Sequence, residues 1–112
     1  VLIKKLFKPP LALISMDIIF EIPDKTRRRI HLSKTQWAHV REEHPHVIET
    51  EDLENTLRNP IKIVQHIDNE SVVDYYTYHK YRKQKSKYLK VVVKYLNGVG
   101  FVITAYFVRY VN

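Results

Sequence analysis

The chain has no cysteine, only two glycines, and no aspartate or glutamate after Asp74. The lack of cysteine excludes disulfides, thiolate metal sites and cysteine nucleophiles. It is typical of proteins in a reducing compartment, so we expect a cytoplasmic location. Long apolar runs are lacking as well, because lysines and Pro9-Pro10 interrupt the segment from Val1 to Ser15. No stretch is therefore long enough to span a bilayer, and no membrane partner is expected.

The length of 112 residues fits a single domain. A hydrophobic content of 45% is enough for one core without covalent cross-links. Met16 is the only methionine. We therefore expect residues 1–15 to be an N-terminal extension and residues 16–112 to form the folded domain.

Positive charge is concentrated in the last third of the chain. The net charge is +7, and every acid lies at or before Asp74, with six of them between Glu42 and Glu54. A cationic surface attracts polyanions, of which RNA is the commonest. Lysines that serve only solubility are the alternative interpretation, although residues of mixed sign would serve solubility equally well.

The residue pattern predicts two short strands, two helices and then four strands. Ser33 and Gln36 form a capping box for a first helix, which ends at His44 because Pro45 follows. A second helix is expected over 50–59, and strands are expected over 18–22, 28–32, 61–67, 72–81, 88–96 and 101–110. This order predicts an α+β fold. Its two N-terminal helices would pack on one face of a four-stranded antiparallel sheet, preceded by a short β-hairpin.

Alternation along the last two strands separates an apolar face from a polar face. The apolar face, expected against the helices, includes Phe101, Ile103, Ala105 and Phe107. The opposite, open face then carries Lys90, Lys94, Thr104 and Tyr106. Lysine beside tyrosine and threonine is suited to gripping phosphate and stacking bases. Strand propensity alone also places these residue types on open faces, so that interpretation stays open.

The first predicted helix carries a second cluster near its end. His44 shares one side of this helix with Trp37 and Val40, whereas His39 lies on another side. A neutral histidine can take the proton of a ribose 2′-hydroxyl, and a charged one can protonate the leaving oxygen. Lysine or arginine would balance the charge that builds on the phosphorus oxygens. These residue types suffice for RNA cleavage without a metal or cofactor.

Other kinds of site lack their signatures. His39 and His44 are five residues apart, whereas paired metal ligands on a helix need a spacing of four. His46 completes no zinc pattern, and the chain has no nucleophile elbow or phosphate-binding glycine loop. No metal site is therefore expected.

Several short motifs, taken in order, resemble the phage-type branch of the barnase, EndoU, colicin-type tRNase and RelE-like nuclease superfamily (the BECR fold). The match covers about Ile18 to Tyr110. Its pieces are Ile30-His31-Leu32-Ser33, Trp37-Ala38-His39-Val40, His44-Pro45, Leu57-Arg58-Asn59-Pro60, Tyr75-Tyr76, Leu89-Lys90-Val91-Val92-Val93 and Thr104-Ala105-Tyr106. Two positions depart from the pattern: Val40 stands where isoleucine is expected, and His46 where an acid is usual.

The resemblance implies a metal-independent endoribonuclease, often a toxin or a phage-associated effector, that acts on tRNA or mRNA. It makes His39 and His44 candidate acid–base residues, with Lys90 steadying the phosphate and Thr104 and Tyr106 lining the cleft. We expect the RNA to be bound by Arg41, Tyr76, Lys94, Arg82 and Lys83. An acidic antitoxin or immunity protein is the expected protein partner.

Two other functions stay open. The same cationic face would also suit a non-catalytic RNA-binding module. Such a module would bind RNA more weakly at higher salt and would not cleave it. It would equally suit an interaction domain for an acidic protein, whose affinity for RNA would be trivial at physiological salt.

Overall fold

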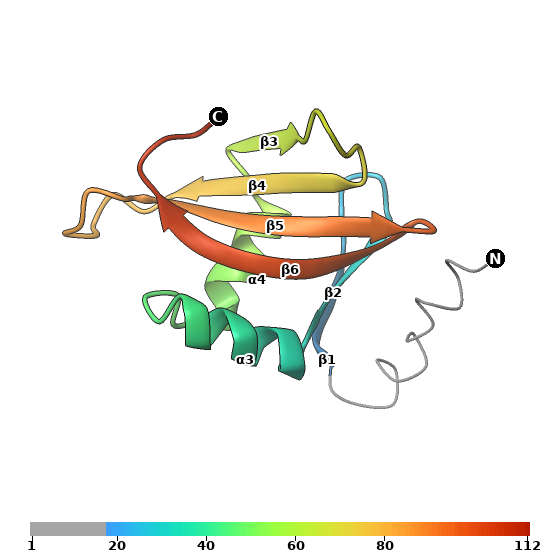
Figure 1. The fold of residues 1–112 in the computed structure, drawn as a ribbon, viewed down its shortest axis with the longest axis horizontal. Coiled ribbons are helices and arrows are strands. Elements are labelled where there is room, and N and C mark those ends of the chain that lie inside the picture. Colours follow the sequence, from blue (N-terminus) through green and yellow to red (C-terminus); the bar gives the residue numbers. More distant parts are fainter. Residues whose placement is uncertain (1–17) are drawn as a thin grey trace.

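The computed structural model describes residues 18–112, which form two helices and six strands (Figure 1). In chain order these are β1 (Ile18–Pro23), β2 (Arg29–Ser33), α3 (Lys34–Glu43), α4 (Thr50–Arg58), β3 (Lys62–Gln65), β4 (Val72–Tyr78), β5 (Tyr88–Leu96) and β6 (Val99–Val108). The order of the predicted elements is confirmed. β4 ends at Tyr78 rather than Tyr81, which lengthens the basic loop before β5 to residues 79–87. The predicted extension over residues 1–15 lies outside the described residues.

The strands form one mixed sheet in the order β1-β2-β6-β5-β4-β3. β2 runs parallel to β6, with Ile30 opposite Gly100, whereas the other neighbours are antiparallel. The predicted four-stranded antiparallel sheet preceded by a separate hairpin is therefore wrong, although the α+β class is right. By joining the sheet, the hairpin buries its apolar residues Ile30 and Leu32, both 0% exposed, in the shared core.

The parallel pairing of β2 with β6 depends on Gly100. A Cβ at this position would lie 2.8 Å from the ring of Tyr95, 3.1 Å from Val93 and 3.2 Å from Ile30. Any larger residue would push these buried side chains apart, so glycine permits the close approach of Ile30 to β6.

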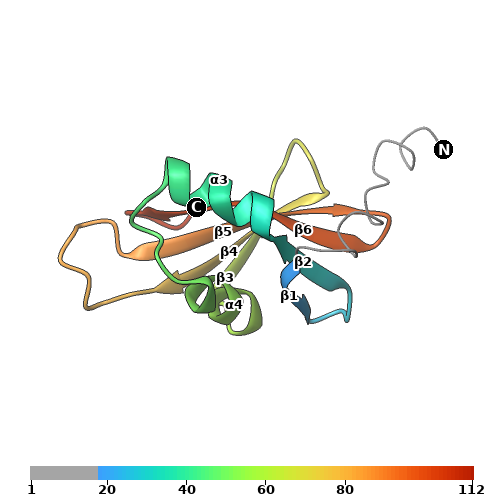
Figure 2. The same ribbon diagram turned by 90° about the horizontal axis from the view of Figure 1, so that it is seen from below.

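The two helices lie at different places on the sheet. α4 packs behind β4 and β5, whereas α3 runs beside β6, which pairs with β2 only at Gly100 and Phe101 (Figures 1 and 2). The prediction that both helices pack on one face is wrong as well. The second face of β4, β5 and β6 is left without a covering helix. We call this face, which lies opposite α4, the open face.

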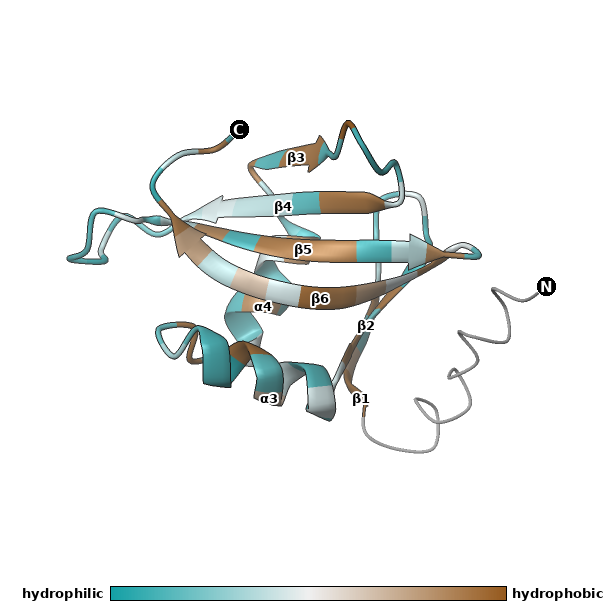
Figure 3. Cartoon of the chain, viewed as in Figure 1, coloured by the Kyte–Doolittle hydropathy of each residue, from teal (hydrophilic) through white to brown (hydrophobic). Residues whose placement is uncertain are grey.

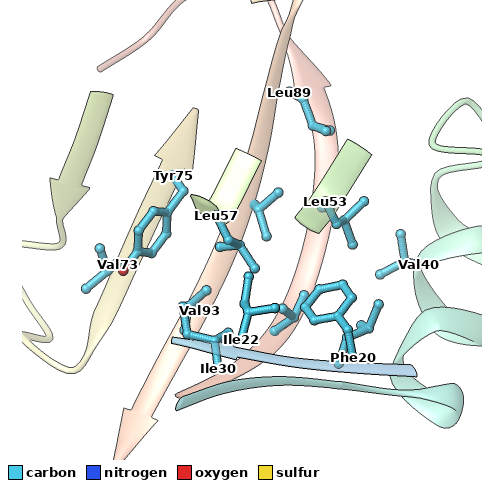
Figure 4. Packing of buried hydrophobic residues seen from close by; sticks show 14 of the residues in the cluster. Phe20, Ile22, Ile30, Val40, Leu53, Leu57, Val73, Tyr75, Leu89 and Val93 are labelled. Carbon is cyan, nitrogen blue, oxygen red and sulfur yellow. The ribbon is translucent and has the colours of Figure 1, made fainter. Parts of the chain in front are cut away.

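The core fills the space between α4 and the sheet. Leu57 of α4 lies near Tyr75 and Val93 of the sheet, whereas Leu53 lies towards Phe20, and Val40 closes the core from α3 (Figure 4). Apolar residues run through the centre of the strands, whereas α3 and the 79–87 loop are mostly polar (Figure 3). Each fully buried apolar side chain contributes about 1.5–3 kcal/mol to the free energy of folding. The core therefore holds the open face in a fixed position.

A bulge in β6 changes which residues face the core. Val92 pairs with Thr104 but Val93 pairs with Val102, so Ile103 is the extra residue. Val102 is buried in the core, whereas Ile103 is 38% exposed. The predicted apolar face is therefore wrong for Phe101 and Ile103, and right for Ala105 and Phe107.

A hydrogen-bonded network attaches the β1–β2 turn to β5. Tyr95 donates its hydroxyl hydrogen to Asp24 at 2.8 Å, and the hydroxyls of Tyr75 and Tyr95 lie 2.7 Å apart. Asp24 also accepts the backbone N–H groups of Thr26 and Arg28 at 2.7 and 2.9 Å. Its side chain is only 3% exposed, so the carboxylate exchanges water for these donors.

Asp24→Asn is expected to lower the free energy of unfolding by about 2 kcal/mol at neutral pH, because it weakens several charge-assisted hydrogen bonds. Burial acts to raise the pKa of Asp24, but hydrogen bonds from Thr26, Tyr95 and Arg28 outweigh it and lower the pKa below the ordinary 3.8. The stabilisation is therefore present above pH 3.8 and is lost as the pH falls through the folded-state pKa. Urea titrations of both proteins down to about pH 2 check this. A difference between them that does not shrink in acid would contradict it.

Candidate active site on the open sheet face

Three neighbouring strands place a row of functional side chains across the open face. Tyr76 of β4 pairs with Lys90 of β5, which pairs in turn with Tyr106 of β6. Lys90 Nζ lies 5.4 Å from the centre of the Tyr106 ring and 6.0 Å from that of the Tyr76 ring. The ammonium group is therefore held between two tyrosines, as the alternation of the strands predicted for Lys90 and Tyr106.

The end of α3 brings an imidazole to this row. His44 follows the last helical residue, and its backbone N–H donates to the carbonyl of Val40 at 2.7 Å. Pro45 prevents the helix from continuing. The ring of His44 stacks on that of Tyr106, with centroids 5.0 Å apart and planes 26° from parallel. The early helix and the late strands therefore meet at Tyr106.

Hydrogen bonds at both ends of α3 hold the helix in this position. Ser33 accepts the N–H of Gln36 at 3.1 Å, as predicted for the N-cap, and the side-chain amide of Gln36 donates to the carbonyl of Ile103 in the bulge. Arg41 donates to the carbonyls of Pro45 and Val47 at 2.7 and 2.9 Å. Arg41 therefore shapes the turn that presents His44, a contact that the sequence prediction of an RNA-binding role did not include.

The row also includes an acid that the sequence reasoning missed. Asp74 lies 3.4 Å from Lys90 Nζ through one oxygen and 2.9 Å from His66 Nε2 through the other. The side chains of Asp74 and Lys90 are 4% and 13% exposed. Alternation along β4 was the available signal, because Asp74 shares a strand face with Tyr76. Lys90 is thus half of a buried ion pair rather than a free surface cation.

The environment keeps Lys90 charged and Tyr76 neutral. Burial acts to lower the pKa of Lys90, but Asp74 and Tyr106 outweigh it and raise the pKa above the ordinary 10.5. Burial raises the pKa of Tyr76, against the opposing effect of Lys90. The Tyr76 side chain is 0% exposed, and its hydroxyl has no hydrogen-bond partner of good geometry among residues 18–112. The row therefore holds one fixed ammonium group between the buried, neutral phenol of Tyr76 and the ring of Tyr106.

The remaining predicted site residues are not all near this row. His39 is exposed on α3, and no hydrogen bond, ion pair or ring contact joins it to the row in the described part of the chain. Thr104 and Lys94 lie on the open face, opposite Val92 and Phe101. Arg82 and Lys83 lie in the 79–87 loop. The structure thus brings together one of the two predicted histidines with Lys90, Tyr106 and Tyr76.

No family model matches the chain, and no curated protein matches it at a significant level. The resemblance to the BECR nucleases therefore stays a prediction.

Among residues 18–112, no three His, Asp or Glu side chains gather as metal ligands would. Neither described helix has the length and apolar composition needed to cross a membrane.

Proposed function

We propose that the protein is a metal-independent endoribonuclease of the toxin type. It would cleave tRNA or mRNA by attack of a ribose 2′-hydroxyl on the adjacent phosphate, leaving a 2′,3′-cyclic phosphate. The observation that carries the proposal is the meeting of His44, Tyr106 and Lys90 on the open face. A proton acceptor and a cation from distant parts of the chain both lie beside the ring of Tyr106, which supports a shared role at one phosphodiester.

Each residue of the row has a chemical role in this reaction. His44 takes the proton of the 2′-hydroxyl while the O2′–P bond forms. Lys90 balances the negative charge on the non-bridging oxygens as the P–O5′ bond breaks. The Tyr106 hydroxyl donates a proton to the leaving O5′, and the proton that His44 took is released to solvent, from which the Tyr106 phenolate regains one. Neither a metal nor a cofactor is required by these steps.

Asp74 is a positioning residue in this scheme. It holds the Lys90 ammonium in one place and, by raising the pKa of Lys90, favours its charged form. A fixed cation stabilises developing charge without reorganising during the reaction. Free positive charge for binding the RNA chain would come from residues outside the pair, such as Lys94 and Lys83.

The same cationic surface favours an acidic antitoxin or immunity protein as the partner of a toxic ribonuclease. Such a protein would neutralise the lysines around the site and exclude RNA. Pull-down from the native host tests this partner, and recovery of no acidic protein would count against it.

Incubation of total RNA with the protein in excess chelator tests the function. Discrete fragments are expected, whose 3′ ends resist polyadenylation until an enzyme that opens and removes cyclic phosphates has acted. RNA that stays intact at high protein concentration would overturn the proposal. Salt-sensitive RNA binding without cleavage would then identify a non-catalytic RNA-binding module.

A further inference from the structure

A pocket of about 700 Å³ lies where the 79–87 loop leaves β4, beside α4. Its lining includes Ile61, Tyr78, His79, Lys80, Tyr81 and Arg82, and none of the lining residues is acidic. The proposed catalytic row does not use this pocket. Apolar, aromatic and cationic groups around one cavity suit a ligand that is both flat and anionic.

Two tyrosine rings at this pocket are open to solvent. Tyr81 is 87% exposed and Tyr78 is 50% exposed. Tyr78 packs against Tyr88, with ring centroids 5.0 Å apart, and Lys80 Nζ lies 5.0 Å from the centre of the Tyr81 ring. Aromatic rings flanked by cations form a platform for nucleobases, since every base has a face that stacks.

The 79–87 loop, which carries Lys80 and Tyr81, is held by its own hydrogen bonds. His79 N–H donates to the carbonyl of Lys87 at 2.8 Å, and Arg82 Nε donates to that of Ser86 at 2.9 Å. The Lys87 ammonium donates to the carbonyl of Arg82, and the Arg82 guanidinium stacks on Phe107 at 3.6 Å. Tyr81 is therefore presented by a loop held by hydrogen bonds and Tyr78 by the end of β4, which lowers the entropic cost of binding.

One lysine that lines the pocket, Lys80, and two further lysines of the same loop have no acidic partner in the described part of the chain. No ion pair with a carboxylate of residues 18–112 involves Lys80, Lys83 or Lys85. These lysines are exposed and follow one another along the loop at alternate or near-alternate positions. They are placed to contact successive phosphates rather than to stabilise the fold.

Tyr78 joins the pocket to the catalytic row. It lines the pocket, whose Asn55 and Thr77 lie on the α4 side, and it shares the open face with Tyr76. Tyr78 pairs with Tyr88, one step along the strands from the pair formed by Tyr76 and Lys90. Two residues of a strand span about 7 Å, and both pairs lie on the open face. An extended nucleic-acid strand that places a phosphate at Lys90 therefore has its neighbouring nucleotide at Tyr78.

The floor of the pocket offers a hydrogen-bonding group. His79 Nε2 lies 3.1 Å from the Thr77 hydroxyl, and the ring makes an edge contact with Phe107. Burial lowers the pKa of His79, although the charge of Asp52 acts in the opposite direction. The imidazole is therefore neutral near pH 7, and one of its nitrogens can read the edge of a base.

We propose that this pocket and its tyrosines bind an unpaired base of single-stranded RNA next to the scissile phosphate, with Lys80, Lys83 and Lys85 on the backbone. The inference rests on the proposed function for the position of the cleaved bond and adds the substrate class. A base in a duplex is already paired and stacked, so it cannot enter the pocket. The protein should therefore select single strands over duplexes.

Binding of a fluorescent 2′-O-methyl oligonucleotide, measured by anisotropy, tests the inference separately from cleavage, because this RNA has no free 2′-hydroxyl. Tyr81→Ala is expected to weaken binding about tenfold, and Lys83→Glu with Lys85→Glu by at least as much. Lys25→Glu, a charge reversal in the distant β1–β2 turn, is the matched control and should bind like the parent. The same sequence annealed to its complement should bind about tenfold more weakly than the single strand.

The outcomes separate this inference from the proposed function. If the parent binds the oligonucleotide with these losses but cuts no RNA, the pocket assignment stands and the nuclease proposal fails. If the parent cuts RNA while Tyr81→Ala and the double variant bind like Lys25→Glu, the assignment is overturned and the nuclease stands. Equal competition by polyglutamate and by single-stranded RNA would also overturn it, in favour of an acidic protein as the ligand.

Discussion

The His44→Ala protein is expected to cleave RNA at least about 100-fold more slowly than the parent, because it loses the proposed general base. The substitution also removes the ring that stacks on Tyr106. His44→Phe separates the two effects, because it keeps an aromatic ring on Tyr106 but has no proton acceptor. Both variants should lose activity, and His44→Phe should unfold at nearly the same urea concentration as the parent.

His39→Ala is the matched control for this prediction. It replaces the same residue type on the same helix, but His39 is exposed and lies away from the row. We expect its rate of cleavage to stay within about twofold of the parent, the range of an ordinary surface substitution. Loss of activity in His39→Ala with normal activity in His44→Phe would contradict the proposed site and favour the other histidine.

The Asp74→Ala protein is expected to lose about 3–5 kcal/mol of its free energy of unfolding, because the substitution leaves Lys90 buried without its partner. The exposed fractions of 4% and 13% place this pair within the protein rather than on its surface. Total stabilities of small domains are about 5–15 kcal/mol, so the loss is a large share. Urea-induced unfolding followed by circular dichroism measures it.

The double variant Asp74→Ala, Lys90→Met is the control for this effect. It removes both charges, so part of the lost stability should return, and the double-mutant cycle gives the coupling between the two residues. The pKa of Lys90 is raised in the folded state, so its contribution is present below pH 10.5 and is lost as the pH rises through the folded pKa. A loss below about 1 kcal/mol in Asp74→Ala would be that of an exposed pair and would contradict a buried one.

Local signals predicted the individual elements well. The Ser33 cap, Pro45 after His44, and the Asn97-Gly98 turn each act within a few residues, and each element that they delimit is present. Such signals depend on backbone geometry and on hydrogen bonds between near neighbours. They therefore predict the ends of an element independently of how distant parts of the chain pack.

Alternation predicted the open face correctly only as far as the bulge. Lys90, Thr104 and Tyr106 share the face as expected, whereas the extra residue Ile103 moves Phe101 to it and Val102 to the core. A bulge is set by packing against neighbouring strands, and one inserted residue reverses the alternation beyond it. No local pattern in residues 99–108 marks that position.

By itself, the amino-acid sequence determined the order of helices and strands, the basic character of the second half, and the residue types available for RNA chemistry. Only the tertiary structure decided that β2 of the first hairpin pairs in parallel with β6, that Asp74 forms an ion pair with Lys90, and that His44 rather than His39 reaches Tyr106. The physical reason is range. Caps, turns and periodicity act between near neighbours, whereas these three contacts join residues far apart in the chain and exist because burial of the shared core leaves them no better arrangement.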